Sequence, residues 1–198
     1  MRGEQPSGWT LCALGQVATW LSGGTPPTGE PSYWNGDIPW ISAASLTQFH
    51  IASSPRCVTE LGTQNRTRVV DPMTIIFVVR GMSLKTEFRI GITTRRVAFG
   101  QDCKALVPKR DIDPLFLAYA IRARAADILN MVDEAGHGTG RLQTDRLKAL
   151  EVPVPPHEEQ RAIAGVLGSL DDKIEANSRL VPLLRDLAIA LLQRAAEA

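Results

Sequence analysis

Residues 157–198 read HEEQRAIAGVLGSLDDKIEANSRLVPLLRDLAIALLQRAAEA, and this stretch decides how the chain must be organised. Helix-forming residues dominate it, and acidic residues occupy the position where the first turn of a helix favours negative charge. A heptad seam, with alternating steps of four and three, runs through Ile163, Leu167, Leu170, Ile174, Asn177, Val181, Leu184, Ala188, Leu191 and Ala195. The stretch therefore predicts a long, coiled-coil-like helix over residues 158–195.

A helix of this length cannot be covered by the rest of so short a chain. Its 38 residues would form a rod of about 57 Å, at about 1.5 Å per residue. Part of the seam must therefore meet a second helix, from another chain or another protein. Asn177 lies in the seam, where a polar residue costs stability but can fix register and partner number. Pro182 lacks a backbone donor and should kink or break the rod, so two shorter helices broken near 177–182 are the alternative.

Composition sets limits on the rest of the chain. A length of 198 residues with 44% hydrophobic content predicts one globular domain with a core, plus an appendage. The chain has no run of about 18 apolar residues, and the first ten residues do not resemble a secretory signal, so no membrane span is expected. The three widely spaced cysteines argue against a disulfide framework and a zinc site, and favour the cytoplasm.

Residue patterns before the long helix predict a mixed α/β domain. Residues 11–22 are expected to form a short helical turn and then a strand, and the Gly/Pro/Ser-rich stretch 22–37 a loop. Patterns of β-branched, aromatic and alternating apolar residues predict strands at 38–42, 74–80, 88–94, 96–99 and 104–107.

Helix signals follow these strands. Asp113 and Pro114 are a cap and a first helical residue, so a helix is predicted from there to about Val132. Residues 135–140 are expected to form a flexible loop and residues 144–149 a short helix. The prolines of residues 152–156 predict an extended segment, because each disfavours a helical residue before it.

Positive charge is concentrated in the middle of the chain. Residues 66–110 hold ten Lys/Arg and three acids, a net charge of +7, whereas the whole chain carries +1. Such a segment is a candidate surface for a polyanion. A solvated sheet face without a partner is the competing interpretation.

Motifs of self-sufficient enzymes are missing. The chain has no phosphate loop, no GxGxxG, no paired metal spacing among its three histidines and no Asn-Pro-Pro-Tyr methyltransferase motif. The prediction is therefore no catalytic residue, no metal site and no cofactor bound by this chain. An enzyme built around His137 is the rival hypothesis, although no local motif supplies the nucleophile and orienting acid that it needs.

Two signatures, in the same order, resemble those of the specificity subunit of type I restriction–modification systems. The first is the stretch 23–41, GGTPPTGEPSYWNGDIPWI, which Trp9 and Leu14-Gly15 precede. The second is the stretch 155–177, with Pro155-Pro156, Glu159-Gln160, Ile163-Ala164, LDDKI and a final Asn. The resemblance covers nearly the whole chain from Trp9 onward.

The resemblance implies a fold and an organisation. Residues 1–155 would form a target-recognition domain with a small mixed β-sheet and flanking helices, and residues 156–198 the spacer and dimerisation helix. In that family the unit normally occurs twice, whereas this chain holds it once. It is thus expected to be a half-subunit that pairs with a second copy or a different half, or else a fragment.

The resemblance also implies a function and partners. The chain would bind one half of a bipartite site in double-stranded DNA and direct a methyltransferase (modification) subunit and a nuclease/translocase subunit. Those subunits would hold S-adenosylmethionine, ATP and Mg²⁺ and perform adenine methylation and ATP-dependent cleavage. A stand-alone DNA-binding regulator or a truncated relic is the alternative. No code converts recognition loops to bases, so the target sequence is not predicted.

Candidate site residues follow from the resemblance and from side-chain chemistry, because base edges and phosphates are bound by basic, amide and hydroxyl groups. The candidates for DNA contact are Thr25, Tyr33, Arg80, Ser83, Lys85, Arg89, Arg95, Arg96, Gln101, His137, Thr139, Arg141 and Gln143. The candidates for the helix interface are Ile163, Leu167, Leu170, Ile174, Asn177, Val181, Leu184 and Leu191. Trp34, Ile38, Trp40 and Ile41 are expected to lie in the core.

Overall fold

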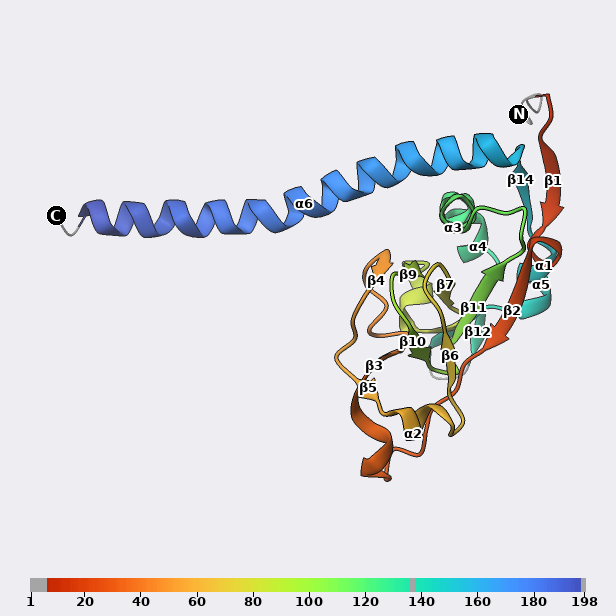
Figure 1. The fold of residues 1–198 in the computed structure, drawn as a ribbon, viewed down its shortest axis with the longest axis horizontal. Coiled ribbons are helices and arrows are strands. Elements are labelled where there is room, and N and C mark those ends of the chain that lie inside the picture. Colours follow the sequence, from red (N-terminus) through yellow and green to blue (C-terminus); the bar gives the residue numbers. More distant parts are fainter. Residues whose placement is uncertain (1–6, 136–137, 197–198) are drawn as a thin grey trace.

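The long helix and the domain beside it are the two parts of the molecule. The computed structural model describes residues 7–135 and 138–196. The helix α6 (His157–Ala196) runs along one end of a mixed α/β domain and then extends beyond it (Figure 1). The predicted fold class is therefore confirmed. Within the described residues, no helix has the length and apolar character needed to cross a membrane.

The described residues form four small sheets. A five-stranded sheet has the order β2 (Ala18–Ser22), β11 (Cys103–Pro108), β7 (Ile75–Val78), β9 (Ile90–Thr93) and β4 (His50–Ile51). A four-stranded sheet has the order β5 (Cys57–Val58), β3 (Trp34–Ile41), β10 (Val97–Phe99) and β6 (Arg68–Val70). The smaller sheets are β12 (Asp133–Ala135), β13 (Thr139–Arg141) and β8 (Arg80–Gly81), and the pair β1 (Thr10–Ala13) and β14 (Glu151–Val154).

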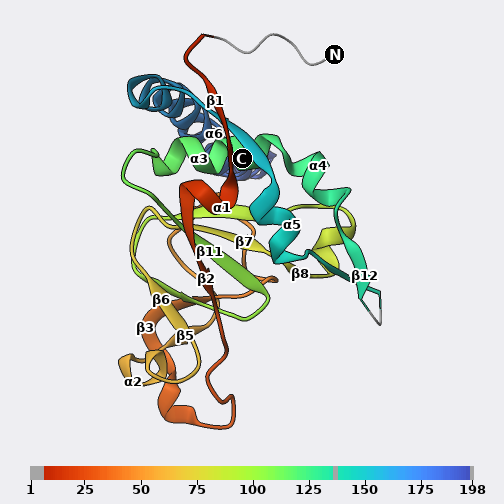
Figure 2. The same ribbon diagram turned by 90° about the vertical axis from the view of Figure 1, so that its right-hand side faces the viewer.

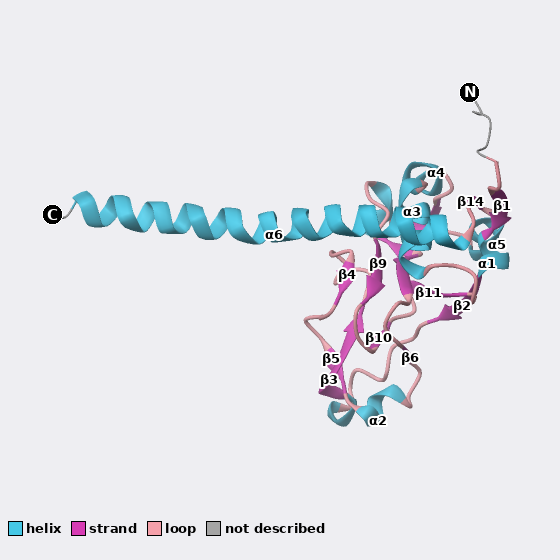
Figure 3. Ribbon diagram, turned by 45° about the horizontal axis from the view of Figure 1, so that its top comes forward, coloured by secondary structure: helices cyan, strands magenta, loops and turns pink. Residues whose placement is uncertain are grey.

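Short helices and turns connect the strands of these sheets. They are α1 (Leu14–Val17), α2 (Glu60–Thr63), α3 (Pro114–Ala123), α4 (Ala125–Leu129), α5 (Thr144–Ala149) and the 3-10 turns η1 (Pro31–Tyr33) and η2 (Met82–Lys85). The Asp113 carboxylate accepts a hydrogen bond from the Phe116 backbone N–H at 2.8 Å, so the predicted cap of α3 is present. Figure 3 shows α3 lying beside the first half of α6.

Two apolar clusters hold the domain together. The larger one surrounds β7, whose four residues are at most 1% exposed, and includes side chains from β9, β10, β11 and α3. The smaller one contains Trp34, Ile38 and Trp40, with the two indole rings edge to face at 5.5 Å. Each indole N–H also donates to the loop before it, to the carbonyls of Pro27 and Gly24. The tryptophans of β3 are therefore core residues, as predicted.

Several predicted elements are wrong in their bounds. The stretch 22–37 is not all loop, because η1 lies in it and β3 begins at Trp34 rather than at 38. The single helix from 114 to about 132 is two helices, since Arg124 leaves helical geometry at φ −94°, ψ 13°. The loop predicted at 135–140 contains strand residues, because Ala135 ends β12 and β13 begins at Thr139.

Other predictions are confirmed. The turn and strand within 11–22 are α1 and β2, the helix at 144–149 is α5, and the extended segment near 152–156 contains β14. The predicted strands from 74 to 107 correspond to β7, β9, β10 and β11, each with slightly different ends. Short strands such as β4, β5 and β6 were not predicted, because two or three residues carry too little pattern.

The long helix is one continuous element. It passes through Pro182 without ending, so the alternative of two shorter helices is wrong. One face of its first half packs on the domain, where Gln160 and Ala164 are buried. The neighbouring face carries the predicted seam, which is open: Leu170 and Ile174 are 53% and 61% exposed. The other seam side chains that the structure describes are half-buried Ile163 and exposed Leu167, Asn177, Val181, Leu184, Ala188 and Ala195. The side chain of Leu191 lies outside those described.

Candidate nucleic-acid interface

The three-stranded ribbon β12–β13–β8 brings distant basic residues together. In its register Arg141 of β13 lies directly opposite Arg80 of β8. Both side chains are exposed, and within the described residues neither donates a hydrogen bond nor forms an ion pair. Like charges opposite each other on a ribbon destabilise it, and a bound anion would relieve that repulsion. The ribbon is therefore a candidate phosphate contact.

The turn η2 adds two more candidate residues to this ribbon. Lys85 is exposed, and its Nζ lies 3.1 Å from where a Cβ atom would stand at Gly138. The Ser83 hydroxyl is buried and has no hydrogen-bond partner among the described residues. The ribbon packs tightly on η2, because a Cβ atom at Gly140 would lie 2.8 Å from the Cβ of Leu84. Glycine at that position lets the basic strand approach the basic turn.

An acidic residue holds the outer strand of the ribbon. Asp133 of β12 lies opposite Arg141, and its carboxylate accepts hydrogen bonds from Gln143 Nε2 at 2.6 Å and Arg146 Nη1 at 3.0 Å. The hydrogen bond from Gln143, with smaller effects of Arg146 and Arg141, lowers the pKa of Asp133 below its ordinary value. Gln143 therefore supports the hairpin in this structure.

Thr25 and Gln101 form a second group. The Thr25 hydroxyl donates a hydrogen bond to Gln101 Oε1 across the end of β10. The neighbouring Gly24 packs so closely on Arg66 that a Cβ atom at Gly24 would lie 1.6 Å from the Arg66 carbonyl oxygen. Tyr33 is half-buried at the end of η1, and its backbone carbonyl accepts from Thr59 N–H at 3.0 Å.

Three other candidate arginines have partners within the domain. Arg89 donates to Glu87 at 3.0 Å and to the carbonyls of Ala43 and Ala44. Arg96 makes a two-pronged ion pair with Glu60, and its hydrogen bond lowers the pKa of that carboxyl. Arg95 donates to the Asp37 carbonyl at 3.2 Å. Binding DNA through these side chains would require breaking or sharing those bonds.

The remaining candidates are placed only in part. Thr139 is half-buried in β13, on the same ribbon as Arg141. His137 lies outside the described residues. Figure 2 shows β8 and β12 on the opposite side of the domain from β3, β5 and β6, so the ribbon lies apart from Tyr33, which directly precedes β3. The sequence did not predict the contact of Asp133 with Arg146, because no local pattern marks a hydrogen bond between residues that far apart.

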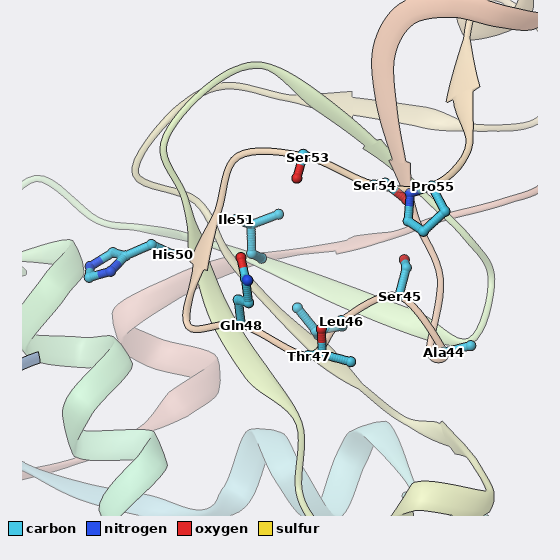
Figure 4. Close-up of a pocket in the computed structure, with 10 residues that line it drawn as sticks. All are labelled: Ala44, Ser45, Leu46, Thr47, Gln48, His50, Ile51, Ser53, Ser54 and Pro55. Carbon is cyan, nitrogen blue, oxygen red and sulfur yellow. The ribbon is translucent and has the colours of Figure 1, made fainter. Parts of the chain in front are cut away.

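A pocket lies between the loops on either side of β4. It has a volume of about 430 Å³ and is lined largely by neutral side chains, among them Ser45, Thr47, Gln48 and Ser53. Figure 4 shows the His50 imidazole at one end of it, directed away from Ser53. Within the described ranges, no three His, Cys, Asp or Glu side chains are grouped as a metal site would require.

Known proteins similar to this chain include specificity subunits of type I restriction enzymes. The EcoR124I/EcoR124II specificity subunit of Escherichia coli is 29% identical over 160 residues, which is 80% of this chain and 40% of that protein. The MjaIX specificity subunit of Methanocaldococcus jannaschii is 25% identical over 194 residues, 96% of this chain and 44% of that protein. This chain thus spans less than half the length of these relatives.

Solved structures show the same fold. The HsdS subunit from Thermoanaerobacter tengcongensis matches with a TM-score of 0.64 at 21% identity, over 90% of this chain and 41% of that one. The type I restriction–modification S subunit from M. genitalium matches with a TM-score of 0.67 at 17% identity, over 94% and 45%. Residues 6–181 match the model of the type I restriction modification DNA specificity domain, and the chain belongs to that family.

Proposed function

We propose that this chain reads one half of a bipartite site in double-stranded DNA and directs an adenine methyltransferase to it. The observation that carries this proposal is the opposed pair Arg80 and Arg141, two exposed guanidinium groups that donate no hydrogen bond within the described residues, although the Asp133 carboxylate lies opposite Arg141 on the next strand. The ribbon that holds them belongs to a domain attached to a helix whose apolar seam is open. The first feature suits an anionic ligand, and the second suits a partner helix.

Phosphate contact and base readout are assigned to different side chains. Arg80, Arg141 and Lys85 bind the DNA backbone, because their side chains are exposed and donate no hydrogen bond within the described residues. Thr25 and Gln101, which share a hydrogen bond in the free domain, offer the hydroxyl and amide groups that suit base edges. Arg89, Arg95 and Arg96 bind DNA less directly, since each has a partner in the free domain.

The exposed seam of α6 pairs with a second helix. Eleven large apolar side chains of α6 are at least 36% exposed, which is more uncovered apolar surface than an unpartnered helix of a globular protein shows. The partner is a second copy of this chain or a different half-subunit. Pairing of two copies would make the DNA site an inverted repeat, because the symmetry of a dimer is copied onto its half-sites.

Catalysis belongs to other subunits in this proposal. The methyltransferase subunit binds S-adenosylmethionine, a nuclease/translocase subunit uses ATP and Mg²⁺, and the assembly works on chromosomal DNA in the cytoplasm. This chain supplies one recognition domain, and the paired helices hold two such domains at a set separation.

A map of methylated adenines in the host genome, with and without this gene, tests the proposal. Loss of a bipartite palindromic motif on deletion is the result expected for a self-paired half-subunit. Loss of an asymmetric bipartite motif would indicate pairing with a different half. Complementation with Arg141→Ala should restore methylation less well than the wild-type gene. An unchanged map would refute the proposed function.

A further inference from the structure

Two polar side chains attach α6 to the domain along one face. The first is Gln160, which is 1% exposed. Its Oε1 accepts from the Asp113 backbone N–H at 2.9 Å, and its Nε2 donates to the carbonyls of Pro155 at 2.9 Å and Asp111 at 3.2 Å. Asp113 also caps α3, so one buried amide joins the start of α6 to the start of α3.

The second attachment is Asp171, about three turns further along α6. Its carboxylate accepts from the Tyr119 hydroxyl at 2.9 Å and from Arg122 Nη1 at 3.0 Å. Burial and then the hydrogen bond to Asp171 raise the pKa of Tyr119, which keeps its hydroxyl a donor. Hydrogen bonds to a charged group are stronger than those between neutral groups.

The edge of the five-stranded sheet meets α3 and α6 at the same place. Phe49 stacks on Tyr119 with ring centroids 4.9 Å apart, and the Arg122 guanidinium lies 4.9 Å from the Phe49 ring. The next residue, His50 of β4, lies 3.6 Å from the carboxylate of Glu175 on α6. The second attachment therefore links α6 through α3 to the edge strand of the five-stranded sheet.

The distance between these two attachments allows them to fix the direction of α6 relative to the domain. Gln160 and Asp171 are about 16 Å apart along the helix axis, and the 25 residues beyond Asp171 extend about 38 Å further. The described side chains from residue 176 onward are all exposed. A change of about 10° in direction at the attachments would move the far end of α6 by about 7 Å, roughly two base-pair steps of DNA.

We propose that Gln160 and Asp171 are positioning residues that fix the direction in which α6 leaves the recognition domain, and thereby the number of base pairs between the two half-sites. This inference rests on the proposed function, in which paired helices hold two recognition domains on one DNA. Neither residue touches DNA in this scheme. Gln160 and Asp171 set the distance between the two half-sites, whereas the ribbon residues determine the affinity for DNA.

The test uses Asp171→Ala and Tyr119→Phe in the full chain, assembled with its methyltransferase subunit. Asp172→Ala is the matched control, because Asp172 is the adjacent exposed carboxylate and forms no hydrogen bond or ion pair within the described residues. The probes are synthetic duplexes that carry the two half-sites of the methylated motif, separated by spacers that lengthen one base pair at a time. A duplex with a single half-site measures affinity apart from spacing.

Wild type and Asp172→Ala should methylate one spacer length best. Asp171→Ala and Tyr119→Phe should reduce the preference for that spacer over its neighbours by about tenfold, with affinity for the single half-site within about twofold of wild type. Tyr119→Phe keeps the inference testable if Asp171→Ala fails to fold. It removes the hydroxyl that donates to Asp171, while the Asp171 carboxylate still accepts a hydrogen bond from Arg122. An unchanged spacer profile in Tyr119→Phe and in folded Asp171→Ala would overturn this inference and leave the proposed function standing. If the wild-type assembly methylated no duplex, the proposed function itself would fail.

Discussion

Arg80 and Arg141 differ from Arg89, Arg95 and Arg96 in what surrounds each guanidinium group. The last three donate to carboxylate or carbonyl oxygens of the domain, whereas the first two face each other across a ribbon. An arginine with a partner in the free protein must break or share that bond to bind DNA, and an arginine without one need not. Arginines of equal charge therefore differ in how much they can contribute to DNA binding.

Arg141→Ala should weaken DNA binding by about tenfold at low salt, because one phosphate contact is lost. The slope of log affinity against log salt concentration should become less steep by about 0.9, the value for one phosphate contact. Fluorescence anisotropy over a salt series measures both quantities. Arg96→Ala is the control, since Arg96 is paired with Glu60 and should have the smaller effect. Equal salt slopes for wild type and Arg141→Ala would rule out a phosphate contact at this residue.

Gly24 shows a different kind of residue requirement. Its φ angle is not positive, so glycine is required here by close packing rather than by turn geometry. Gly24→Ala would place a methyl group 1.6 Å from the Arg66 carbonyl oxygen. The variant should therefore lose about 2–4 kcal/mol of folding free energy in a urea titration. Gly29→Ala is the control, because nothing lies within 4 Å of its Cβ position; a comparable loss in both variants would argue against close packing.

At the scale of elements, long patterns were predictable and short ones were not. The seam of α6, the apolar run of β7 and the Asp113 cap each leave a local signal in the sequence. The ribbon β12–β13–β8 leaves none, because its strands are two or three residues long and β8 is about fifty residues before β12. The candidate site shares this limit: basic residue types could be chosen from sequence, but the pairing of Arg80 with Arg141 is a tertiary contact.

Pro182 is the one proline inside α6. It removes a backbone hydrogen bond and crowds the preceding turn, which costs a helix interior about 3 kcal/mol. Pro182→Ala should therefore stabilise the helix and raise its melting temperature, followed by circular dichroism at 222 nm. Ala176→Leu, an exposed substitution without a backbone effect, is the comparison. A lower melting temperature in Pro182→Ala would mean that the kink which proline imposes on α6 stabilises the paired helices.

The whole molecule is organised around the two faces of α6. One face holds Gln160 and Asp171 against the domain, and on the neighbouring face the described seam side chains from Leu167 onward are exposed. The domain is thereby fixed to a rod whose exposed seam is separate from the ribbon, since Figure 2 shows α6 at the top of the domain and β8 and β12 at its side. Recognition and assembly can then be altered separately, by substitutions on different surfaces.

Leu170→Glu tests the seam as an assembly surface. Leu170 is 53% exposed in the single chain, so the substitution should not unfold the domain. In a pair of identical chains it would bury two charges and remove two leucine contacts, each worth about 1.5–3 kcal/mol, so dissociation constants should rise by about 100-fold or more. Sedimentation equilibrium over a concentration series measures this change. Ala176→Glu adds the same charge outside the seam and should associate like wild type. If Leu170→Glu also associated like wild type, the seam would not be the surface through which copies pair, and a different half-subunit would become the partner to test.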